Sequence, residues 1–401
     1  MFKTLAERLR NSDIDFWLLV PLMVNTVLVQ IVTAIVRITT SYRAVELDLS
    51  IVWLGLIAAA FALLPVLIAV QTGRFIDRGH DALTIWIGSA LFTLGCAGFV
   101  IWRSPEALLI STTVMGAGHL MLMASQQMLC VRAAGPRSME SIFGNYMVAG
   151  AIGQGIGPYV VGWMGGSATV PPTQPLFVLA LIVAVISLGC SLTMRPHRDR
   201  PKPLADKELV PVSALLRIPG LLPVVIAGVV MIAASDIIVI YVPLLGAERT
   251  IDVHDIGLLL TVRAASSMTA RLFYARMVAT AGHWPLMIAS TFACAAAFGA
   301  LAAPLSLPWM YVIMIVMGFS FGLATTLSIT IIVDMTTAGA RGTANSLRIM
   351  GNRLGQFVLP FGAGLVAAVT GLSGLLLVMS GAILAAAVAV HVKRPVKPPE
   401  Q

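Results

Sequence analysis

Long apolar runs are the feature that most constrains how this chain folds. A helix needs about 20 mostly apolar residues to cross the roughly 30 Å hydrocarbon core of a bilayer, and runs of this length recur along the sequence. Of the 401 residues, 58% are hydrophobic and 11% are charged, whereas soluble domains average about 25% charged residues. The composition excludes a soluble enzyme, a disordered chain and a nucleic-acid-binding module, and it predicts an all-α polytopic membrane protein.

Twelve such runs occur, six on each side of one long charged segment. That segment, RPHRDRPKPLADKELVP, begins at Arg195. We therefore predict an N-terminal six-helix bundle over 1–194, a cytoplasmic linker over 195–217 and a C-terminal six-helix bundle over 218–401. The predicted spans are 16–40, 50–71, 83–102, 106–130, 142–165, 175–194, 219–245, 256–277, 284–303, 308–333, 344–369 and 373–391.

The positions of Lys and Arg predict which side of the membrane each loop faces. Basic residues gather in cytoplasmic loops. If the N-terminus is cytoplasmic, the loops of the opposite side hold only Arg43, Arg103 and Arg249. This asymmetry accounts for the net charge of +8, so no nucleic-acid partner is needed to explain it. We expect an integral, multi-pass protein of a bacterial inner membrane with both termini cytoplasmic.

Short sequence matches recur between the two halves at a nearly constant offset. The tripeptide VMG at 114–116 returns at 316–318, and the pattern GQxxxP at 153–158 returns at 355–360, each 202 residues later. The dipeptide GH at 79 and the pattern AGxR at 134 return after 203 and 204 residues. Because four matches keep both their order and their spacing, we predict a duplicated six-span unit in parallel orientation.

The loop between the second and third spans reads GRFIDRGHD, from Gly73 to Asp81. With six plus six spans and a basic central segment, the chain resembles the major facilitator superfamily, whose loop motif is GxxxDRxGRK. Gly73, Asp77 and Arg78 match that motif, whereas His80 and Asp81 replace its basic pair. The resemblance implies two pseudo-symmetric six-helix bundles and a cytoplasmic latch made by Asp77 and Arg78. The alternative is a solvated turn with an ordinary surface ion pair, which contributes little.

The fifth span contains a second motif, GQGIGPYVVG, from Gly153 to Gly162. It is similar to the GxxxGPxxGG motif of the superfamily's antiporters, with Val161 in place of one glycine. Glycines permit close helix packing, and a proline permits a bend. The resemblance implies a rigid hinge typical of exporters, while plain helix packing is the alternative. The residues concerned are Gly153, Gly157, Pro158 and Gly162.

Polar side chains inside the predicted spans are the strongest functional signal, because each is costly in hydrocarbon and must face a partner or a wet cavity. A polar stripe on the eleventh span indicates a water-filled pathway. It consists of Asn345, Arg348, Asn352 and Gln356. The candidate substrate-binding residues are Asn25, Arg37, Gln154, Arg263, Asn352, Arg353 and Gln356.

Asp236 and Arg263 lie at matching depth on consecutive spans, which predicts that they pair. The pair is either a static lock or a working one, in which Arg263 binds a substrate anion and Asp236 carries a proton. His119, the only mid-span histidine, is the second candidate for proton coupling, with a bond to a backbone carbonyl as its simpler role. Because several buried arginines face one buried aspartate, we expect the missing countercharge to be an anionic substrate.

These features predict a secondary active transporter that works by alternating access, is coupled to protons and moves a small organic anion such as a carboxylate. The span-five motif favours export. A proton-coupled multidrug efflux antiporter and a non-transporting membrane sensor on the same scaffold are the alternatives. No enzyme activity, metal or cofactor is expected, and the four cysteines show no pairing pattern. The resemblance implies a monomer in the lipid bilayer.

Overall fold

The computed structural model describes residues 15–133, 139–194, 215, 217–336 and 341–393, and this part of the chain is helical without strands. The helices are α2 (Phe16–Glu46), α3 (Ile51–Asp77), α4 (Asp81–Ile101), α5 (Pro105–Ala133), α6 (Met139–Gly165), α7 (Thr173–Thr193), α9 (Leu221–Glu248), α10 (Val253–Leu272), α11 (Tyr274–Ala281), α12 (His283–Leu301), α13 (Leu307–Met335) and α14 (Arg341–Val392). Most of the predicted linker lies outside the described residues, and so do the AGxR repeats apart from Arg341.

Every predicted span overlaps a helix. Within the described ranges, nine helices are long and apolar enough to cross a membrane, and α10 with α11 makes a tenth such segment when the bent pair is counted as one span. The long helix α14 contains two predicted spans, because Gly371 between them is non-helical (φ 71°, ψ −178°). Helix α6, with 27 residues, supplies the remaining span. The predicted all-α fold with twelve spans is confirmed.

The span predicted over 256–277 is wrong at its C-terminal end. Helix α10 ends at Leu272, and α11 continues at an angle of 58° to it. None of the residues of α11 is buried. The apolar run continues through Leu272, Phe273 and Tyr274, so composition alone gives no sign of the bend. Tyr274, Met277 and Val278 are partly buried against the hydrophobic core, so α11 rests on the side of the bundle rather than inside it.

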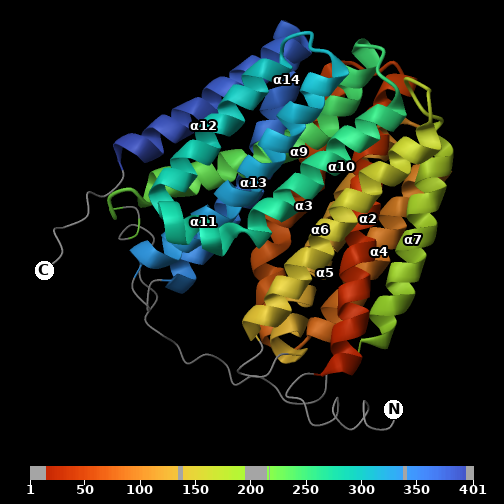
Figure 1. The fold of residues 1–401 in the computed structure, drawn as a ribbon. Helices are drawn as coiled ribbons and strands as arrows, with labels where there is room; N and C mark the ends of the chain where they lie inside the picture. The colour runs from red at the N-terminus through yellow and green to blue at the C-terminus, as the bar shows by residue number, and fades with distance from the viewer. Residues whose placement is uncertain (1–14, 134–138, 195–214, 216, 337–340, 394–401) are drawn as a thin grey trace, which may run out of the picture.

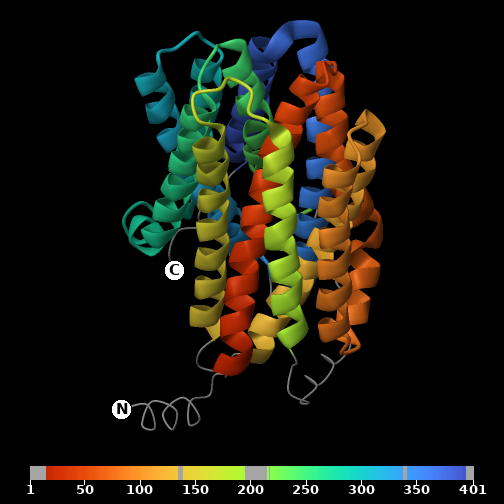
Figure 2. The ribbon, with the colours of Figure 1, turned by 90° about the vertical axis from the view of Figure 1, so that its right-hand side faces the viewer.

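The helices form two groups that follow the two halves of the chain (Figure 1). The first group holds α2 to α7, and the second holds α9 to α14. In Figure 2, α6, α2 and α7 of the first group lie side by side along the height of the molecule. We call the end at which α3 finishes the inner end and the opposite end the outer end, following the predicted orientation. The two halves are equivalent at the repeated VMG sequence. Gly116 packs against the backbone of Phe61, and Gly318 packs in the same way against Arg263, 202 positions later.

Two glycine crossings join the bundles in their outer halves. At one crossing α3 meets α14, where a Cβ on Gly55 would lie 2.8 Å from the Cα of Gly364. At the other α10 meets α6, where a Cβ on Gly257 would lie 2.6 Å from the Cα of Gly162. The two crossings are related by the internal repeat. Gly257 and Gly364 lie 202 residues after Gly55 and Gly162, respectively. Only glycine permits backbones to approach this closely.

The inner ends of the two bundles diverge, so the molecule is joined mainly through its middle and outer parts (Figure 1). Asp77 and Arg78 lie at this end and are both exposed. Neither forms an ion pair with another described residue, and Gly73 has open space beside it. The buried ion pair of this region instead joins Arg132 of α5 to Asp81 of α4, with Nε and Oδ2 2.9 Å apart. The latch through Asp77 and Arg78 therefore stays a prediction.

The crossing of α3 and α14 predicts opposite effects on stability when either of two nearby glycines of α14, Gly364 and Gly362, is replaced by alanine. In Gly364→Ala, the new methyl group would meet the backbone of Gly55, and overpacking of this kind costs about 1–3 kcal/mol. In the control Gly362→Ala, nothing lies within 4 Å of the new methyl group, and alanine is the better helix former. We expect a lower midpoint of thermal unfolding in detergent for the first variant and an equal or higher one for the second. Equal midpoints in both variants would contradict the crossing.

Candidate functional site

A polar cavity of about 110 Å³ lies where the two bundles meet. Its walls come from α2 and α6 of the first bundle and from α9 and α10 of the second. Each of these helices contributes at least one polar side chain near its middle. The lining residues are Gln30, Thr33, Ala34, Arg37, Gln154, Pro158, Ser235, Asp236, Val239 and Arg263.

An ion pair crosses this cavity from one bundle to the other. Nη1 of Arg37, on α2, donates to Oδ1 of Asp236, on α9, over 2.7 Å. The two side chains are 17% and 15% exposed, so the pair is largely removed from solvent. The guanidinium of Arg37 also lies over the ring of Phe61, 5.3 Å from its centre. Removing one partner of such a pair leaves an uncompensated charge away from water, which is strongly destabilising.

The second oxygen of Asp236 is held from α14. Nε2 of Gln356 donates to Oδ2 of Asp236 over 2.8 Å, while Oε1 of the same amide accepts from Nη1 of Arg353 over 3.1 Å. Arg353 therefore fixes which end of the Gln356 amide faces the carboxylate. The result is a chain of contacts from Arg37 through Asp236 and Gln356 to Arg353, which connects α2, α9 and α14.

Arg263 reaches the same cavity from α10 but does not pair with Asp236. Its Nη1 donates to Oγ of Ser235 over 2.9 Å, and its guanidinium lies 5.8 Å from the ring centre of Phe321. The residue is 7% exposed, and its Nε has no hydrogen-bond partner within the described chain. The predicted pair between Arg263 and Asp236 is wrong. Asp236 and Arg263 do lie at the same cavity. The cation nearest to Asp236, however, is Arg37 of the other bundle, and sequence spacing within one half cannot show such a contact.

The charges at the site are unbalanced. Three arginines, Arg37, Arg263 and Arg353, surround one carboxylate, that of Asp236. Among the described residues, no other carboxylate lines the cavity. Buried cations require a countercharge, and among the described residues a carboxylate within ion-pair distance is found for Arg37 only.

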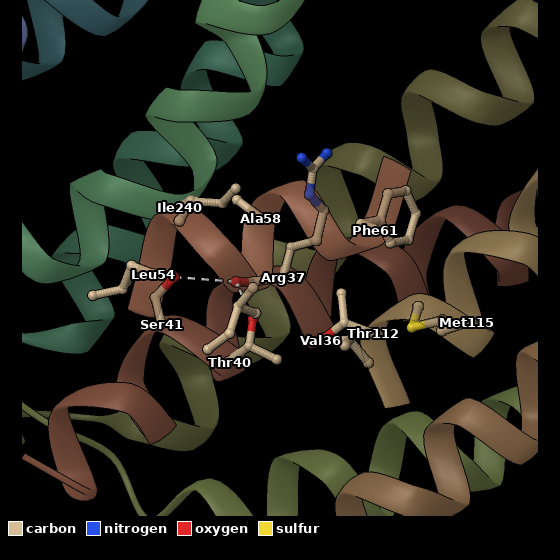
Figure 3. A pocket seen from close by; sticks show the side chains of 11 residues that line it. Val36, Arg37, Thr40, Ser41, Leu54, Ala58, Phe61, Thr112, Met115 and Ile240 are labelled. Atoms are coloured by element: carbon tan, nitrogen blue, oxygen red, sulfur yellow. Dashed lines mark hydrogen bonds between the residues drawn. The ribbon is translucent and has the colours of Figure 1, made fainter. Parts of the chain in front are cut away.

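A second, smaller pocket of about 20 Å³ lies on the other side of Arg37 (Figure 3). The aliphatic part of Arg37 forms one wall, and its guanidinium extends away from Thr112. The remaining walls are largely apolar and come from both bundles. Arg37 therefore borders both spaces, the polar cavity and this apolar pocket. The lining residues are Val36, Arg37, Thr40, Ser41, Leu54, Ile57, Ala58, Phe61, Thr112, Met115 and Ile240.

Asn25 lies elsewhere, in the interior of the first bundle. Its Nδ2 donates to the backbone oxygen and the hydroxyl of Ser187, over 2.8 and 2.9 Å, and its Oδ1 accepts from Gln126 over 2.8 Å. The residue is fully buried, and it lines neither space beside Arg37. Since all of these bonds stay within α2, α5 and α7, Asn25 holds the bundle together in this conformation rather than facing a substrate.

His119 also lies outside the lining of both spaces. Its ring packs between Phe61 and Phe92, with ring centres 5.2 and 6.3 Å away, and its Nε2 has no partner in the described part of the chain. No hydrogen bond to a backbone carbonyl occurs at that atom. Asn352 is half-buried, and its amide oxygen is likewise without a described partner. The side chain of Asn345 lies outside the described residues.

Sequence reasoning missed three polar groups of the cavity, Gln30, Thr33 and Ser235. A signal for the first two was present. Positions 30, 33 and 37 follow one another at spacings of three and four, so they share one face of a helix. Ser235 carries no such signal, because serine is common in membrane helices and its role depends on the bond from Arg263.

The glycine motif of the fifth span faces two directions. Gly153 and Gly157 pack against α2 within their own bundle, close to the backbone of Val27 and the side chain of Ala34. Pro158 and Gly162 instead pack against α10 of the other bundle. The motif thus contributes both to the inside of a bundle and to the outer crossing, which fits the packing role. A specific role in export stays a prediction.

Comparisons with known proteins give the same architecture. The sequence matches the family model of the Major Facilitator Superfamily over residues 22–250 and 224–401. A mutant of the nucleoside transporter NupG is similar in structure, with a TM-score of 0.81 and 16% identity, over 94% of this chain and 100% of that chain. A D-xylose–proton symporter has a TM-score of 0.76 and 14% identity, over 95% of this chain and 98% of its own. No curated protein matches the sequence.

A third similar structure is a bacterial homologue of the human lysosomal transporter Spinster, in an inward-facing and occupied conformation. Its TM-score is 0.73 at 14% identity, over 94% of this chain and 96% of that chain. The match to the family model over nearly the whole chain identifies a multi-pass membrane transporter rather than an enzyme. The chain belongs to the major facilitator superfamily.

The ion pair between the bundles predicts non-additive losses of stability. In Arg37→Gln, Asp236 keeps its charge without its partner, and breaking a buried pair in this way costs about 3–5 kcal/mol. In the double variant Arg37→Gln with Asp236→Asn no charge is left unpaired, so we expect it to be more stable than the sum of the single losses allows. Thermal unfolding in detergent measures all four proteins of this cycle. Strictly additive losses would show that the two groups do not interact.

Proposed function

We propose that this transporter moves a small organic anion, such as a carboxylate, by proton-coupled alternating access. Arg263 carries the proposal. It is a buried guanidinium at the wall of a polar cavity, it forms no ion pair within the described chain, and its Nε has no hydrogen-bond partner there. A guanidinium matches a carboxylate in bidentate geometry. An anion in the cavity would supply the countercharge that the site lacks.

Arg37 is the second proposed ligand of the anion. It lines the same cavity as Arg263 and belongs to the opposite bundle, so an anion held by both would connect the two halves. Gln154 of α6 is exposed at the same cavity and offers an amide for further hydrogen bonds. Arg353 and Gln356 act through Asp236 rather than at the cavity wall.

Asp236 is the proposed proton carrier. Its carboxylate holds Arg37 across the bundle interface, and protonation would remove the charge on which that pair depends. Arg37 would then be released to the anion, and the two bundles would lose one connection at this depth. Such a change biases the equilibrium between the two access states, as a coupled transporter requires. His119 is the second candidate, although it lies away from the cavity wall.

The size and charge of the cavity support a small anion over the multidrug alternative. Pockets for drug-sized ligands are typically about 300–1,000 Å³, whereas this cavity is about 110 Å³. Its single carboxylate is already paired with Arg37, which leaves little to attract a cationic drug. We propose export as the physiological direction, a monomer as the working unit, and a bacterial inner membrane with both chain termini in the cytoplasm.

Transport in proteoliposomes tests the substrate class. The purified protein would be given a panel of carboxylates, sugars, nucleosides and cationic drugs, with a pH step imposed in each direction. We expect flux of one or more small carboxylates that changes with the direction of the step. Flux of cationic drugs alone would support the multidrug alternative, and no flux of any compound would support the sensor.

Neutralising Arg263 tests the proposed anion site. We expect Arg263→Gln to lower carboxylate transport by at least about tenfold, since a charge-assisted hydrogen bond contributes about 1.5–3 kcal/mol. The matched control is Arg276→Gln, because Arg276 is exposed on α11 and lines neither space beside Arg37. Full activity of the Arg263 variant, in protein of normal thermal stability, would refute the anion site.

Neutralising Asp236 tests the proton coupling separately. We expect Asp236→Asn to abolish the response of carboxylate flux to an imposed pH gradient, while exchange of carboxylate across the membrane without a gradient is retained in part. The measurement compares gradient-driven uptake with counterflow in the same vesicles. Gradient-driven uptake at the wild-type level would move the proton coupling to another group, with His119 the next to test.

A further inference from the structure

The carboxylate of Asp236 has one partner in each bundle. Its Oδ1 accepts from Arg37 of α2, across the bundle interface. Its Oδ2 accepts from Nε2 of Gln356 on α14, over 2.8 Å. Since α9 and α14 both belong to the second bundle, the bond from Gln356 does not cross the interface. It holds Asp236 from the side that does not separate when the two bundles move apart.

The Gln356 amide can face a carboxylate in two ways, and Arg353 selects one of them. A guanidinium has donors only, so Oε1 of Gln356 turns toward Nη1 of Arg353, 3.1 Å away, and Nε2 turns toward Asp236. A donor in this position favours the ionised carboxylate. Without Arg353 the amide is free to turn over, because the last torsion of a glutamine side chain is roughly two-fold. Oε1 would then face Asp236, and only a protonated carboxyl group can donate to it.

We propose that Arg353 is a positioning residue for the proton carrier: by fixing the orientation of the Gln356 amide, it sets how readily Asp236 accepts a proton. The proposal rests on the function proposed above, in which Asp236 carries the proton. With Arg353 in place the carboxylate stays ionised and holds Arg37. Without Arg353, Asp236 accepts a proton from a less acidic solution and releases Arg37 sooner.

The other charged groups that face Asp236 in the described structure are arginines. Arg37 comes from α2 and forms the ion pair. Arg263 of α10 and Arg353 of α14 both lie close enough to interact with its charge. Helix α13, which also packs against α9, carries a single charged residue, Asp334, at its inner end. Among these groups, Arg353 is the one that also controls a hydrogen bond to the carboxylate.

Infrared difference spectroscopy measures the protonation of Asp236 without requiring transport. A protonated carboxyl group has a C=O stretching band that a carboxylate lacks, and comparison with Asp236→Asn assigns the band. We expect Arg353→Met to raise the pH at which Asp236 is half protonated by about one unit, a tenfold gain in proton affinity. The pH of half-maximal gradient-driven carboxylate flux should rise by the same amount in proteoliposomes. Arg353→Lys, which keeps a charged donor, should restore most of the wild-type value.

A second background separates action through the amide from the direct effect of the charge of Arg353. Gln356→Leu has no amide to orient. If Arg353 acts through Gln356, adding Arg353→Met to this variant should shift the protonation of Asp236 by less than half as much as it does in the wild type. An equal shift in both backgrounds would overturn the inference, because Arg353 would then act by its charge alone.

Arg132→Met is the control for structural damage. Arg132 forms a buried ion pair with Asp81 at the inner end of the first bundle, so its loss should lower thermal stability without moving the protonation of Asp236. The same half-protonation pH in Arg353→Met and the wild type would overturn the inference but leave the proposed function standing. Wild-type carboxylate flux that ignores the pH step would instead refute the proposed coupling, even where the infrared shift is found.

Discussion

The ion pair between Arg37 and Asp236 is the interaction on which the organisation of the site depends. It joins α2 of the first bundle to α9 of the second at the depth of the polar cavity. Through Gln356 it also reaches Arg353 on α14. A charge pair in low-polarity surroundings is stable only while both partners remain. Any event that changes the charge of Asp236 or offers Arg37 another anion therefore acts on the contact between the bundles.

The duplicated unit provides the frame that holds this pair in place. Two glycine crossings, Gly55 with Gly364 and Gly257 with Gly162, bring the bundles together in their outer halves. They are one contact used twice, related by the internal repeat. Because the inner ends diverge (Figure 1), these two crossings hold the bundles together toward the outer end. At both crossings backbone meets backbone, and the carbonyl oxygens of Pro360 and Pro158 lie beside Gly55 and Gly257 in the same way.

Much of the site was predictable from the sequence, because buried charges in a membrane chain are few. Arg37, Asp236, Arg263, Gln154 and Gln356 were found by that reasoning, and the structure brings them together. Asn25 and His119 satisfied the same criterion of depth, yet they lie among α2, α5 and α7 or between aromatic rings. Depth along a span follows from residue number, whereas the direction in which a side chain points depends on how its helix is rotated against its neighbours.

The sequence by itself determined the class of protein, the number of spans, the duplication and the small set of charges inside the bilayer. Hydrophobicity and spacing are properties of the chain alone, and these features follow from them. Only the tertiary structure decided which charges pair. It placed Arg37 rather than Arg263 on Asp236, left Arg263 beside Ser235, and put Thr112 in a pocket shared with Arg37. The reason is that these partners come from different helices, and their meeting depends on the packing of one bundle against the other.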